Sequence, residues 1–109
     1  MNKTNAYGLQ DVDGLTELQQ QIIRFYHNNP FVEYLHIQVR PLAGGQVRLE
    51  LEGGEEHTNL YGIAHGGVLM TMADTAMGAA CLACNKKVVT INLGTDFMHA
   101  VPMTETIVA

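Results

Sequence analysis

Serine is absent from this chain, and so are the sequence motifs that mark common nucleotide-binding loops. Without serine, neither a Ser-His-Asp mechanism nor a G-x-S-x-G nucleophile elbow is possible. A phosphate-binding loop and the G-x-G-x-x-G dinucleotide motif are also missing. Any chemistry must therefore use carboxylates, histidines, amides or backbone groups.

Cysteines and basic residues are scarce as well. Cys81 and Cys84 are too few for a disulfide scaffold, and no second pair exists to complete a zinc site. Six Lys and Arg against eleven Asp and Glu give a net charge of −5, which argues against nucleic-acid binding. No secretory signal is visible, and the apolar segment 68–84, which contains Asp74, is too short and too polar for a membrane span. We therefore expect a soluble, cytoplasmic protein without metal or cofactor.

The pattern of apolar and turn residues predicts a single α+β domain. The 109 residues allow one domain, with an N-terminal tail at 1–14 and the folded part at 15–109. Thr16 and Gln19 have the spacing of a capping box at the start of a short amphipathic helix. The expected elements are helices at 15–28 and 66–84, strands at 31–40, 46–52 and 88–97, a turn at Ala43-Gly44-Gly45, and the start of a strand at 105–109.

The helix expected at 66–84 is apolar on every side, so it should be buried on every side. Strands before and after it favour an antiparallel sheet wrapped around one long central helix, which is the hotdog architecture. Asp74 is the one ionisable side chain in this helix besides the cysteines. A buried carboxylate is costly unless it faces a cleft, a subunit boundary or a ligand. The alternative is a solvated Asp on an exposed edge of the helix.

The helix begins at His65-Gly66-Gly67. Glycines there let a ligand approach the backbone, and free N–H groups at a helix N-terminus stabilise developing negative charge. The oxyanion that forms from a thioester carbonyl is such a charge. The alternative is a tight junction that needs glycine for steric reasons.

The run from His57 to Gly78 closely resembles the signature of hotdog acyl-CoA thioesterases of the phenylacetate-pathway type. It contains N-x-x-G-x-x-H-G-G from Asn59 to Gly67 and D-x-A beginning at Asp74. The resemblance extends over about residues 15–108. It implies hydrolysis of an acyl-CoA thioester to the free acid and CoA.

The resemblance also implies roles for individual residues. Asp74 would serve as general base or nucleophile, and the backbone N–H of Gly66 would polarise the carbonyl. Asn59 would place substrate or water, and His65 and Gly67 would shape the same junction. A hydroxyl at the position of Thr90 assists the water in some members.

Helix geometry adds a constraint on the assembly. Gly66 and Asp74 are eight residues apart, about 12 Å along a helix, so one carbonyl cannot contact both groups of a single chain. We therefore expect a homodimer, pairing again into a tetramer, with two shared sites. Alternatives for the activity are a hotdog hydratase or dehydratase, and a non-catalytic acyl-CoA-binding protein. Because members of the thioesterase family that this chain resembles usually run longer, we expect the C-terminal strands to be missing. The acyl group is not determined by the sequence.

Overall fold

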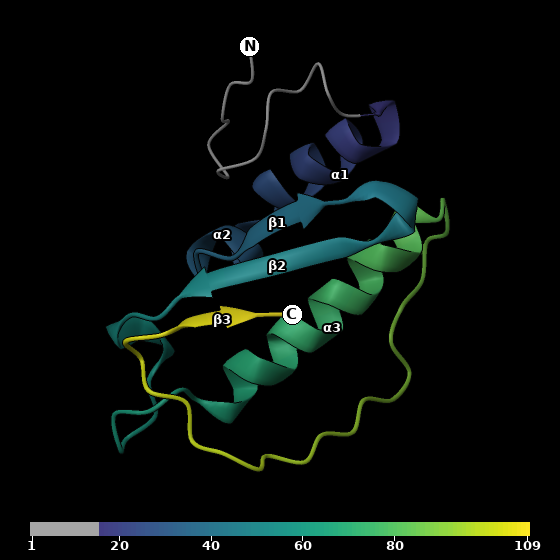
Figure 1. Cartoon of the computed structure of the whole chain (residues 1–109). Helices are drawn as coiled ribbons and strands as arrows, with labels where there is room; N and C mark the ends of the chain where they lie inside the picture. The colour runs from purple at the N-terminus through teal and green to yellow at the C-terminus, as the bar shows by residue number, and fades with distance from the viewer. Residues whose placement is uncertain (1–15) are drawn as a thin grey trace.

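Three antiparallel strands and one long helix form the centre of the structure (Figure 1). The computed structural model describes residues 16–109, so the expected tail at 1–14 lies outside the described residues. The elements are α1 Glu17–His27, α2 Pro30–Tyr34, β1 Gln38–Pro41, η2 Ala43–Gly45, β2 Val47–Glu52, η3 Glu55–His57, α3 Gly66–Ala83 and β3 Thr106–Val108, where η denotes a 3₁₀ helix.

The sheet has the order β1-β2-β3, with β2 in the middle. Val39 of β1 lies opposite Leu49 of β2, and Leu51 of β2 lies opposite Ile107 of β3. Val39, Leu49 and Leu51 are fully buried, whereas the residues between them are not. Alternation therefore puts one apolar face of the sheet against the helices, as the sequence predicts.

The first helix confirms the capping prediction, but the expected strand at 31–40 is wrong in its first half. Thr16 accepts a hydrogen bond from the Gln19 N–H, and the Gln19 side chain accepts one from the Thr16 N–H. Asn29 then caps a second helix, α2, with Pro30 at its first position. Proline is favoured there because its φ suits a helix and its missing N–H costs nothing. Only residues 38–41 form β1.

The central helix α3 packs mainly on β2 and also contacts α1. Val68, Met72 and Ala79 of α3 join the buried side chains of the sheet, α1 and α2 in one core cluster. From the sequence, the segment 68–84 is expected to be too short and too polar for a membrane span. The helix α3 begins at Gly66, and by length and apolar content it does meet the criteria for such a span. One such helix is weak evidence for a membrane, because the central helix of a soluble fold meets the same criteria.

The predicted strand at 88–97 is wrong: this segment is extended but pairs with no strand. It follows α3 as a long arc that leaves the body of the molecule before returning to β3 (Figure 1). Within residues 16–109, no backbone hydrogen bond joins residues 88–100 to another residue. Ile91 is 98% exposed. The β-branched composition that suggested a strand is present, but a strand also needs a neighbour to accept its hydrogen bonds.

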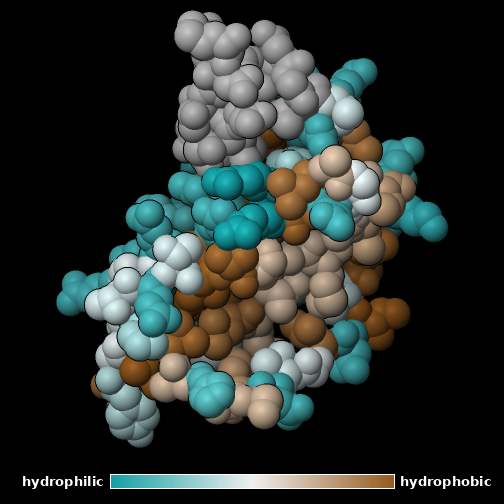
Figure 2. Space-filling model, in the orientation of Figure 1, coloured by the Kyte–Doolittle hydropathy of each residue, from teal (hydrophilic) through white to brown (hydrophobic). Residues whose placement is uncertain are grey.

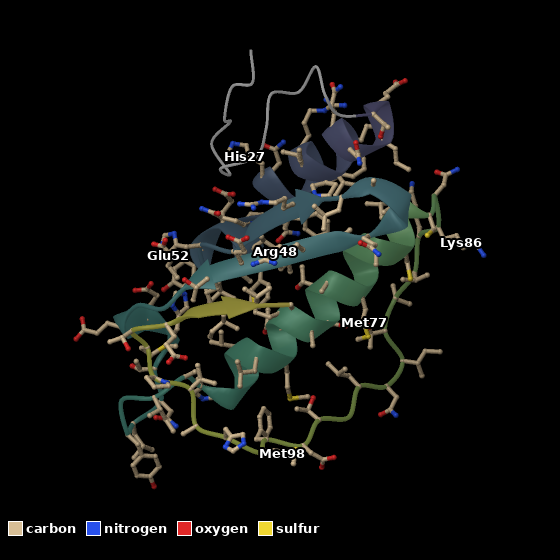
Figure 3. All side chains as sticks on the ribbon, in the orientation of Figure 1. His27, Arg48, Glu52, Met77, Lys86 and Met98 are labelled. Atoms are coloured by element: carbon tan, nitrogen blue, oxygen red, sulfur yellow. The ribbon has the colours of Figure 1, made fainter. Side chains whose placement is uncertain are left out.

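A single chain does not bury α3 on every side. Only Val68, Met72 and Ala79 are fully buried. Met77 projects from the side of α3 turned away from the sheet (Figure 3). Apolar surface fills the middle of the face where β3 and α3 lie (Figure 2). One side of the central helix is therefore open in the monomer.

Candidate active site

Asp74 lies in the middle of α3, on a face that Thr71, Thr75 and Gly78 share at helical spacing. Its side chain is half-buried, and the hydroxyl of Thr90 donates a hydrogen bond to its Oδ1 atom. The two residues come from different segments, because Thr90 belongs to the extended segment after α3. The structure thus brings together two of the residues that the sequence singled out.

Two cavities border this pair. The larger has a volume of about 600 Å³, and Asp74 and Thr90 both line it. Its walls come from α1 and α2, from α3 and from the extended segment, and they include Tyr26, Asn29, Phe31, Thr75, Gly78 and Val88. A second cavity of about 290 Å³ also contains Asp74 and Thr90, together with Met70 and Leu93. Asp74 therefore borders two adjoining cavities.

Asn59 organises the loop before α3. Its side-chain oxygen accepts hydrogen bonds from the backbone N–H of Tyr61 at 2.8 Å and of Ile63 at 3.3 Å. Gly62 has φ +79°, a conformation that side chains rarely adopt, and its N–H donates to the Asn59 carbonyl. This turn explains why the motif pairs an Asn with a Gly three residues later. Within residues 16–109, no acceptor uses the amide nitrogen of Asn59, which leaves it available to a ligand.

The start of α3 leaves one backbone N–H free. The Nδ1 atom of His65 accepts a hydrogen bond from the Gly67 N–H at 2.9 Å, so His65 is the N-cap and Gly67 is already paired. The N–H of Gly66 has no acceptor among residues 16–109. Gly66 and Asn59 line a third cavity, of about 360 Å³. A free N–H at a helix N-terminus is a donor suited to an oxygen that carries negative charge.

Two histidines near the motif have structural roles. His57 is fully buried. Its Nδ1 atom accepts from the Gly54 N–H at 3.0 Å, so Nε2 carries the proton and donates to the Leu35 carbonyl at 2.8 Å. The side chain of His65 caps α3, and the backbone N–H of His65 donates a hydrogen bond to the backbone carbonyl of His57. Both side chains hold the loop and helix start in place.

The candidate residues fall into two separate groups. Asn59 and Gly66 line one cavity, whereas Asp74 and Thr90 line the others. Sequence reasoning missed two aromatic residues at these places. Tyr26 reaches the larger Asp74 cavity from α1. The ring of Phe97 covers Gly66 so closely that an added Cβ would lie 3.1 Å from it.

Residues 61–109 of the chain match the family model described as Thioesterase superfamily. A curated protein of Archaeoglobus fulgidus named "Putative esterase" is 27% identical over 84 residues, which are 77% of this chain and 54% of that protein. The chain thus spans about half the length of this relative.

Solved structures resemble most of the chain. The E. coli PaaI protein from the phenylacetic acid degradation operon matches with a TM-score of 0.75 and 23% identity, over 86% of this chain and 69% of that chain. Zebra fish thioesterase superfamily member 2 matches with a TM-score of 0.68 and 29% identity, over 81% of this chain and 67% of that one. The fold is the hotdog fold. The match at 61–109 covers the start of α3 with Gly66, as well as Asp74 and Thr90.

Proposed function

We propose that this protein hydrolyses an acyl-CoA thioester to the free acid and CoA. The observation that carries the proposal is the placement of Asp74. It is a carboxylate on an otherwise apolar central helix, it faces a cavity large enough for an acyl group, and Thr90 contacts it. The match of residues 61–109 to the Thioesterase superfamily supports the same reaction.

Each group has a distinct role in the proposed reaction. Asp74 either attacks the thioester carbonyl carbon or removes a proton from the water that attacks it. The carbonyl oxygen becomes an oxyanion, which the free N–H of Gly66 stabilises. The unused amide nitrogen of Asn59 donates to the same substrate or to the water. Collapse of the intermediate breaks the carbon–sulfur bond, and CoA leaves as the thiol after it takes up a proton. If Asp74 is the nucleophile, this step leaves a mixed anhydride on Asp74, which water then hydrolyses to the free acid. Water is the only co-reactant, so no metal or cofactor is required.

The proposed site is shared between two copies of the chain. Gly66 and Asp74 are separated by about 12 Å along one rigid helix, and they line different cavities. A second copy related by a two-fold axis would bring its Gly66 to the Asp74 of the first, which forms two equivalent sites. The open apolar side of α3 and the exposed segment 88–97 offer surface for such a partner. We therefore propose a homodimer as the active form, with a tetramer formed by further pairing.

A panel of acyl-CoAs with aromatic, arylacetyl and medium-chain acyl groups tests the proposed reaction. We expect stoichiometric release of free thiol from at least one of them, measured with a thiol-reactive chromophore. A hydratase would instead change the absorbance of an enoyl-CoA without releasing thiol. Tight binding without thiol release across the whole panel would contradict hydrolysis and favour an acyl-CoA-binding protein.

A further inference from the structure

The phenol hydroxyl of Tyr26 is a polar group in the larger Asp74 cavity that the proposed reaction does not use. Tyr26 is half-buried in α1 and lines this cavity together with Asp74 and Gly78. Within residues 16–109, its hydroxyl makes no hydrogen bond. The hydroxyl is therefore free to bond to water or to a ligand in this cavity.

The hydroxyl lies beside Gly78, one helical turn beyond Asp74. A Cβ atom added at Gly78 would lie 3.8 Å from the phenol oxygen. Asp74 and Gly78 are four positions apart in α3, which corresponds to about 6 Å along the helix. If the reacting carbonyl is at Asp74, the Tyr26 hydroxyl therefore faces the acyl group about one helical turn further along.

The phenol remains a hydrogen-bond donor at neutral pH. Burial raises the pKa of Tyr26, and the nearby carboxylate of Asp74 raises it further. Phe31 and Val88 supply apolar surface to the same cavity, which suits the carbon skeleton of an acyl group. The cavity thus combines apolar surface with the phenol donor of Tyr26 beside Gly78, one helical turn from Asp74 along α3.

We propose that Tyr26 selects acyl groups that carry an oxygen atom about one helical turn from the thioester carbonyl, to which its hydroxyl donates a hydrogen bond. The inference rests on the proposed function, because it places the reacting carbonyl at Asp74. In this role Tyr26 determines specificity and takes no part in breaking the thioester bond.

Binding of two matched thioether analogues of CoA tests this inference independently of hydrolysis. Hexyl-CoA and 5-hydroxyhexyl-CoA differ only in one hydroxyl, and calorimetry gives the ratio of their dissociation constants. We expect Tyr26→Phe to reduce the preference for the hydroxylated analogue roughly five- to tenfold, the usual size of one net hydrogen bond. Tyr34→Phe is the control, since Tyr34 is 76% exposed on α2, and it should leave the ratio unchanged.

Three results would overturn the role of Tyr26: an unchanged ratio in Tyr26→Phe, equal weakening of both analogues, or no binding of either analogue beyond that of CoA alone. The test also separates the two proposals. A Tyr26-dependent preference without thiol release from any thioester would contradict hydrolysis and leave the inference standing. Thiol release from a thioester without a Tyr26-dependent preference would support hydrolysis and contradict the role of Tyr26.

Discussion

Asp74→Asn should lower kcat for thioester hydrolysis by about 10²–10⁴-fold, the range typical for loss of a general base. Asparagine has nearly the same shape as aspartate, but its amide neither accepts a proton from water nor attacks the carbonyl. Its side-chain oxygen can still accept the hydrogen bond from Thr90. The fold should therefore survive, and substrate KM should change far less than kcat.

The measurement is the rate of thiol release on the best acyl-CoA of the panel, with circular dichroism as a check on folding. Glu17→Gln is a control for the loss of one carboxylate, because it makes the same change from carboxylate to amide at an exposed residue at the start of α1, outside the segment 88–97. It should retain wild-type kcat. Equal rates for wild type and Asp74→Asn would show that this carboxylate takes no part in the reaction.

Gly66→Pro should lower kcat about 10²–10³-fold, the usual effect of losing one oxyanion donor. Gly66 is the first residue of α3, where proline is well tolerated because its φ suits a helix. The residue before it, His65, has φ −64° and ψ 132°, which is a conformation that a following proline permits. The substitution thus removes one N–H while the helix can still begin at the same place.

Gly66→Ala separates the loss of the N–H from the effect of added bulk. In both variants the added Cβ lies about 3.1 Å from the end of the Phe97 ring. Because the Phe97 side chain is half-exposed, a small shift of the ring relieves this contact. Alanine keeps the N–H, so Gly66→Ala should stay within a few-fold of wild type. If alanine and proline reduce kcat to the same degree, bulk accounts for the loss and the backbone N–H is not the oxyanion donor.

The local elements of the fold follow from the sequence because neighbouring residues determine them. The capping box at Thr16 and Gln19, the turn before β2 and the start of α3 at Gly66 each depend on a few adjacent residues. A local signal also explains why the first half of the strand expected at 31–40 is a helix instead. Asn29 and Pro30 form a strong helix start, which outweighs the apolar run that follows.

Long-range contacts explain the parts that the sequence does not reveal. Whether residues 88–97 form a strand depends on a neighbouring strand, and within residues 16–109 no other segment pairs with them. The apolar sides of α3 indicate that it is central, but they do not distinguish burial by the same chain from burial by a second copy.

The site shows the same division between local and long-range information. The spacing from Asn59 to Gly66 and the isolation of Asp74 in an apolar helix are visible in the sequence. Tyr26 looks like an ordinary apolar-face residue of α1, and only the packing of α1 against α3 brings it to the Asp74 cavity. Phe97 comes from the extended segment, whose course no local pattern determines.

A mixed dimer of Asp74→Asn and Gly66→Pro chains tests the central claim, a catalytic site shared by two chains, most directly. The two variants are coexpressed with different affinity tags, and dimers that carry both tags are purified in two steps. If Asp74 of one chain works with Gly66 of its partner, one of the two sites contains both wild-type groups and the other lacks both. If each site lies within one chain, every site has a defect.

We predict that the mixed dimer recovers about half of the wild-type thiol release, although each variant alone is nearly inactive. The two homodimers, carrying the same tags and purified in the same way, set the baseline. A mixed dimer that is no more active than these homodimers would contradict a site built from two copies of the chain.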